Sequence, residues 1–121
     1  MKYILTYLVF SFSLLINAQG QVEMNDIAHE NYYQSQKFED SLVLELVKIN
    51  KNDSIFMKSF DASEKLWDHF VEKQFELKFP EYDTWGNRRQ VYGSQFDMLY
   101  YQFMKLYCDL RISTLYDLFE D

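Results

Sequence analysis

Residues 93–118 read GSQFDMLYYQFMKLYCDLRISTLYDL, and this stretch decides the fold of the chain. Side chains recurring three and four positions apart share one face of an α-helix. Those here are Phe96, Leu99, Tyr100, Phe103, Leu106, Tyr107, Leu110, Thr114 and Leu118. No glycine or proline interrupts the run after Gly93, and the Ser94 hydroxyl can accept a backbone N–H where the helix begins. Such a helix needs a partner to cover its apolar face.

Two further helices are expected upstream. The segment 54–79 follows a candidate N-cap, Asp53, and ends before Pro80. Its apolar face comprises Phe56, Phe60, Ser63, Trp67, Phe70, Val71 and Phe75. The segment 24–50 has a similar stripe at Ala28, Tyr32, Phe38, Leu42, Leu46 and Ile49. The pattern predicts an all-α fold of three helices, a long antiparallel hairpin of 54–79 and 94–118 with 24–50 packed on it.

The first 18 residues have the layout of a secretory signal peptide. Lys2 gives a positive start, an apolar run covers 4–16, and Ala18 is a small residue at the expected cut. The apolar run is shorter than the roughly 20 residues of a membrane-spanning helix. We therefore expect an exported protein, periplasmic or extracellular, with a domain at 19–121 and no stable membrane span after cleavage. A retained N-terminal anchor is the alternative.

The charge and cysteine content narrow the classes of function. The formal net charge is -7, which disfavours nucleic acid as a partner and suits a basic protein. Cys108 is the single cysteine, so no disulfide can form within the chain. It is expected to be an inert, at least half-buried thiol, with pairing between two chains as the alternative. Packing must supply the stability, and aromatic residues make up 19% of the sequence.

The loop 80–94 is the candidate contact surface for a partner. It combines turn residues with aromatic ones, and tyrosine and tryptophan supply much of the energy at protein interfaces. The candidate contact residues are Tyr82, Asp83, Trp85, Tyr92 and Ser94. In the competing interpretation, Trp85 and Tyr92 fold back and fill the open end of the bundle. Gly93 is expected to adopt a positive φ before the helix.

The pattern of Gly93 and Ser94, followed by Tyr100 and Arg111, with Trp67 on the preceding helix, resembles the lysozyme inhibitor LprI-like family. These are small exported domains otherwise of unknown function, and the similarity spans about residues 25–118. The resemblance implies a non-enzymatic, protein-binding role. It also implies that the partner is a lysozyme-type enzyme that cleaves peptidoglycan.

The chain departs from the family at two places. Family members usually carry a cysteine eight residues after the tryptophan and another nine after the serine, which resembles a disulfide between helices. Phe75 and Phe103 stand there in this chain. The family pattern on the first helix is also not kept, with SQKFED at 35–40 instead.

If Phe75 faces Phe103 across an antiparallel pair, then Trp67 faces Arg111, Val71 faces Tyr107 and Phe60 faces Leu118. Arg111 would stack on the Trp67 ring and pair with Glu64 or Asp68. This role as a clamp between two helices is favoured over contact with a ligand.

No pattern in the sequence is typical of an enzyme. His69 with Asp68, Glu72 and Glu76 could suggest a metal site, but the other helices lack matching ligands, and a solvated charged edge is the simpler interpretation. Phosphate-binding glycine loops and nucleophile elbows are missing from the sequence. We expect no catalytic residue, no metal and no cofactor.

Two functions are therefore carried forward. The first is an exported binding module that inhibits lysozyme-type hydrolases. The acidic charge of the chain suits a hydrolase that is basic. The second is a structural or adaptor protein of the cell envelope without lysozyme inhibition. The oligomeric state is left open.

Overall fold

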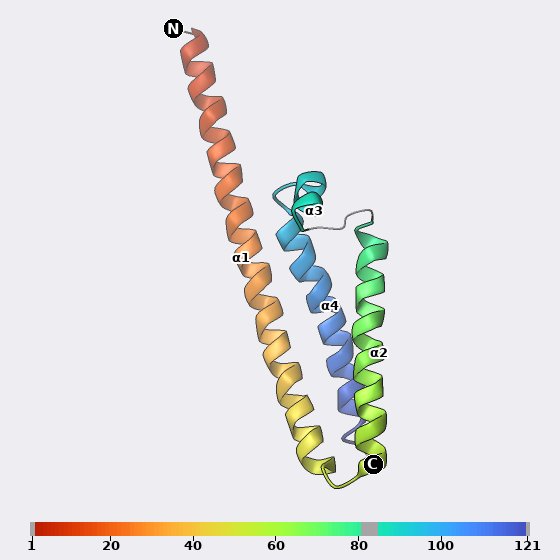
Figure 1. Ribbon diagram of the computed structural model, residues 1–121. Coiled ribbons are helices and arrows are strands. Elements are labelled where there is room, and N and C mark those ends of the chain that lie inside the picture. Colours follow the sequence, from red (N-terminus) through yellow and green to blue (C-terminus); the bar gives the residue numbers. More distant parts are fainter. Residues whose placement is uncertain (1, 81–84, 121) are drawn as a thin grey trace.

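A computed structural model describes the backbone of residues 2–80 and 85–120, and the side chains of Leu8, 18–80 and 88–120. The described part is all-α, without strands, and contains four helices (Figure 1). These are α1 (Lys2–Asn50), α2 (Ser54–Lys78), α3 (Trp85–Tyr92) and α4 (Phe96–Asp117). The all-α prediction is confirmed. The prediction of three helices is wrong, because part of the expected loop 80–94 forms α3.

Helix α4 lies between α1 and α2 (Figure 1). It runs parallel to α1, since Asn25 bonds to Met98 near the start of α4 and Glu39 bonds to Cys108 further along. It runs antiparallel to α2, since Trp67 lies by Tyr107 and Phe75 lies by Phe103.

The closest pair of helices is α1 and α4, not the expected hairpin of α2 and α4. The side chains explain the difference. The small Ala28 is buried on the face of α1 toward α4, whereas bulky rings such as Trp67 and Phe75 fill the space between α2 and α4. Small residues let backbones approach closely, and rings hold them further apart.

Helix α1 continues without a break through residues 19–23, upstream of the helix expected at 24–50. Its first part projects beyond the other helices (Figure 1). Among the side chains that the structure describes, those bonded to α4 begin at Gln21. None of the helices, within the residues described, is long and apolar enough to cross a membrane.

Two apolar clusters form the core. One lies near the turn between α1 and α2 and contains Leu46, Phe60 and Leu115. The other lies at the opposite end of α2 and contains Phe79, Phe96 and Phe103. Between the clusters, α4 presents the buried residues Cys108 and Arg111.

The buried band of α4 is rotated from the expected stripe. Leu106, Leu110 and Leu118 are exposed, while Cys108, Arg111 and Leu115 are buried. The cause is α1, which packs on the side of α4 that carries Cys108 and Leu115. Leu115 therefore packs with Phe60 in place of the expected Leu118. On α1, Ile49 is likewise exposed.

Candidate functional site

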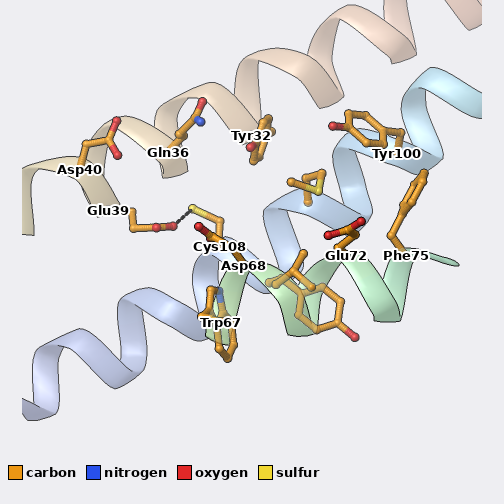
Figure 2. A pocket seen from close by; sticks show the side chains of 13 residues that line it. Tyr32, Gln36, Glu39, Asp40, Trp67, Asp68, Glu72, Phe75, Tyr100 and Cys108 are labelled. Atoms are coloured by element: carbon orange, nitrogen blue, oxygen red, sulfur yellow. Dashed lines mark hydrogen bonds between the residues drawn. The ribbon is translucent and has the colours of Figure 1, made fainter. Parts of the chain in front are cut away.

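A groove of about 500 Å³ opens between α1, α2 and α4 (Figure 2). Its volume falls within the range of about 300–1,000 Å³ that is typical of ligand pockets. Three helices contribute to its walls, and they mix aromatic, aliphatic and acidic side chains. The lining residues are Tyr32, Gln36, Glu39, Asp40, Trp67, Asp68, Val71, Glu72, Phe75, Tyr100, Met104, Tyr107 and Cys108.

A thiol and a carboxylate meet at one wall of the groove. The Cys108 thiol donates to Glu39 Oε2 across 2.8 Å, the bond dashed in Figure 2. Burial raises the pKa of the thiol far above its usual range, and the Glu39 acceptor adds to that shift. The prediction of a buried cysteine is confirmed, since Cys108 is 6% exposed. A thiol held protonated in this way is a poor nucleophile.

The pKa values of two other groups on the same wall, Glu39 and Tyr32, are also raised. Burial raises the pKa of the Glu39 carboxyl, although the hydrogen bond from Cys108 opposes the shift. Burial also raises the pKa of Tyr32 to about 12, with nearby Tyr100, Cys108 and Glu39 adding to it. Both groups therefore favour their neutral forms more than they would in water.

Arg111 forms the expected clamp between α2 and α4. Its guanidinium lies 5.6 Å from the centre of the Trp67 ring, and its Nε donates to Glu64 Oε1 at 2.9 Å. The Nη2 atom of Arg111 also donates to Glu64, and Nη1 donates to the Thr114 hydroxyl at 3.4 Å. Arg111 is 7% exposed, so this cation is buried with both a carboxylate and an aromatic face.

The rings of Phe75 and Phe103 lie edge to face with their centres 5.6 Å apart. The expected contact is present, and Tyr100 and Phe79 surround Phe75 in the same cluster. The idea that this pair stands in for a disulfide of relatives stays a prediction.

The Gly93-Ser94 motif positions the start of α4, but Ser94 does so through its backbone. Gly93 has a φ of 78°, as expected for a turn glycine. The hydroxyl of Ser94 makes no cap, and α4 begins at Phe96. Asn25 of α1 replaces it, accepting from the Met98 N–H and donating to the Ser94 carbonyl, both at 3.1 Å. The prediction that Ser94 caps the helix with its hydroxyl is therefore wrong. The cap comes from Asn25 on another helix, which the residues next to α4 in the sequence cannot reveal.

The candidate partner contacts divide into groups. Tyr82 and Asp83 lie outside the described residues, and so does the side chain of Trp85, whose backbone begins α3. Tyr92 is half-buried, and its ring packs edge-on against Phe79 at 5.2 Å. Its ring therefore fills the end of the bundle, as the competing interpretation had it. Ser94 is exposed.

The residues that sequence reasoning missed are Asn25 and Glu39. Each contacts a residue about 70 positions away in the chain, and neither belongs to a local motif. Tyr100, one of the family-motif residues, lines the groove together with Trp67. Within the part of the chain that the structure describes, no group of three or more ligating side chains could hold a metal ion.

Comparison with known proteins adds no family or fold assignment, since no family model, curated protein or solved structure matches this chain.

Proposed function

We propose that this chain is an exported, non-enzymatic binding module for a basic protein, and that the partner is a lysozyme-type peptidoglycan hydrolase. The observation that carries the binding role is the groove, in which aromatic walls are combined with four carboxylates. The resemblance of Trp67, Gly93, Ser94, Tyr100 and Arg111 to the LprI-like pattern supports the choice of partner.

Export is supported by the signal-like sequence of residues 1–18 and by the way the start of α1 projects from the bundle (Figure 1). Cleavage after Ala18 would leave in the mature chain Gln21 and Asn25, which are the first described side chains of α1 that bond to α4. We propose that the mature domain keeps the close packing of α1 on α4 and the antiparallel ring contacts of α2 with α4.

A lysis assay tests this function. Purified residues 19–121 are titrated into a suspension of bacterial cell walls with a basic lysozyme, and clearing of the suspension is followed. We expect slower lysis at micromolar protein, because a bound acidic module would block the enzyme's basic surface. Unchanged lysis at micromolar excess, with the added protein folded by circular dichroism, would remove the inhibitor function.

A second candidate is an envelope adaptor that binds a different protein or itself. It is favoured by three exposed apolar residues on one face of α2, Ile55, Leu66 and Leu77, which lie three turns apart and are 80%, 70% and 74% exposed. Size-exclusion chromatography with and without reductant tests self-association. If the protein is a monomer at all concentrations and inhibits lysozyme, the adaptor function is excluded and the first candidate remains.

A further inference from the structure

The groove between α1, α2 and α4 has acidic residues on two opposing helices. Glu39 and Asp40 come from α1, and Asp68 and Glu72 come from α2. Figure 2 shows Glu39 reaching from α1 toward Cys108, while Asp68 and Glu72 rise from α2 toward α1. Within the described residues, no lysine or arginine lines the groove. Arg111 acts on Glu39 from outside this lining, and its guanidinium is already bonded to Glu64.

The apolar part of the lining lies with these carboxylates in one pocket. Val71 and Phe75 of α2 and Met104 of α4 contribute it, together with the rings of Trp67 and Tyr107. Such an apolar wall suits the uncharged, aliphatic part of a ligand rather than a second charged group. A long aliphatic stem with a single cationic head therefore matches the groove, which is the chemistry of a lysine or arginine side chain.

Two arginines of the chain already use the rings that line the groove. Arg111 lies over Trp67 and pairs with Glu64, and Arg88 lies over Phe75 with its Cζ atom 4.5 Å from the ring centre. Neither arginine lines the groove itself. The pairing of a cation with a ring and a carboxylate is thus chemistry that this interior already supports at Arg111.

We propose that the groove receives a lysine or arginine side chain of a protein partner, with the stem against Val71, Phe75 and Met104 and the charged head between Glu39 and the α2 carboxylates. The volume of about 500 Å³ leaves room for neighbouring atoms of the partner as well as the inserted side chain. This inference rests on the proposed binding function. It specifies which chemical group the partner supplies and where that group lies.

A fluorescence titration tests the site directly, because Trp67 lines the groove and the chain has two tryptophans. In a Trp85→Phe background, Trp67 is the single reporter. The probe is a short blocked peptide with a central lysine, compared with the same peptide carrying norleucine. We expect the lysine peptide to change Trp67 emission saturably, and the norleucine peptide to bind at least roughly tenfold more weakly, which corresponds to about 1.4 kcal/mol.

Matched charge variants separate the groove from the general acidity of the protein. Asp68→Asn with Glu72→Gln removes two charges from the groove. Glu45→Gln with Asp61→Asn removes two exposed charges that do not line it. We expect the groove variant to weaken lysine-peptide binding by roughly tenfold or more, and the control to change it by less than about threefold. Equal weakening by both variants would overturn the proposal.

Two further arms distinguish the alternatives. If a free aliphatic diamine binds the groove more tightly than the lysine peptide, with the same dependence on Asp68 and Glu72, the protein side chain is the wrong occupant. If lysozyme is inhibited equally by the wild type and the groove variant, the groove inference fails while the proposed function stands. If the lysine peptide binds in the groove but lysozyme is not inhibited, the hydrolase is the wrong partner and the groove inference stands.

Discussion

Arg111 is a buried cation whose partners come from two helices. The Trp67 ring and the Glu64 carboxylate of α2 hold it, and Thr114 of α4 completes the set. A planar guanidinium can stack on the ring and donate through two nitrogens to one carboxylate, and an ammonium cannot reproduce both contacts. Arg111 thus joins α2 to α4 at the level of the groove.

We expect Arg111→Lys to lower the free energy of unfolding by about 1–3 kcal/mol, since it leaves Glu64 and Trp67 poorly matched. Urea denaturation measures the change. Arg89→Lys is the control, because Arg89 makes a similar forked contact to Asp97 while its side chain is 53% exposed. The control should cost less than about 1 kcal/mol. Equal losses in both variants would contradict the clamp.

Asn25 caps α4 from a distance. We expect Asn25→Ala to destabilise the protein by about 1–2 kcal/mol, because it removes both the acceptor for the Met98 N–H and the donor to the Ser94 carbonyl. Asn31→Ala, at an exposed site on the same helix, is the control and should be nearly silent. Thermal unfolding of the two variants side by side gives the answer, and a silent Asn25→Ala would mean that water caps α4 equally well.

Glu39 predicts a pH dependence of stability. Its folded-state pKa is raised by burial, so the stability it contributes is fully present below the unfolded value and is lost as the pH rises through the folded pKa. Glu39→Gln keeps an acceptor for Cys108 without the charge. We therefore expect this variant to be more stable than the wild type near neutral pH, with the advantage shrinking in acid well below pH 4.5, the ordinary pKa of the group.

Chemical denaturation across this pH range checks the expectation. Glu45→Gln, at an exposed site on the same helix, is the control for the loss of one carboxylate from α1. A constant difference between Glu39→Gln and the wild type at every pH would show that the carboxylate is not penalised in the folded state.

At the scale of the elements, α4 is covered by α1 on one side and by α2 on the other. The contact with α1 is close, and the contact with α2 is made through rings. Phe103 is central to the second contact, since it is buried against Phe75, Phe79 and Tyr107. Its loss should loosen α2 from α4 and open the groove.

We expect Phe103→Ala to cost about 3–5 kcal/mol, from lost burial and the cavity left between the helices. Leu106→Ala, one turn further along α4 at a 53% exposed site, should cost less than about 1 kcal/mol. Calorimetry or urea denaturation distinguishes them. Similar costs at the two sites would mean that the ring cluster contributes little to joining the helices.

At the scale of the whole molecule, the net charge of -7 acts on partners before contact. We expect association with a basic lysozyme to slow by roughly tenfold or more between low and physiological salt, because screening shortens the range of the attraction. Stopped-flow or surface-based kinetics at several salt concentrations measure this rate. A salt-independent association rate would argue against steering by charge.

The sequence by itself determined three of the helical segments, the break at Asp53 and the turn at Gly93, which follow from local periodicity and backbone preference. The ring contact of Phe75 with Phe103 was expected from the family resemblance, which implies that these two positions face each other. The clamp at Arg111 was predicted in the same way, since it lies at the register that the two phenylalanines define.

Only the tertiary structure decided that α1 runs parallel to α4 and packs on it most closely. That packing buries Cys108 and Leu115 in place of Leu110 and Leu118, supplies the cap at Asn25, and creates the groove with Glu39 on its wall. The physical reason is that these contacts join residues about 70 positions apart, whose side chains carry no local signature of one another. Which face of a helix is buried depends on which neighbouring helix packs against it.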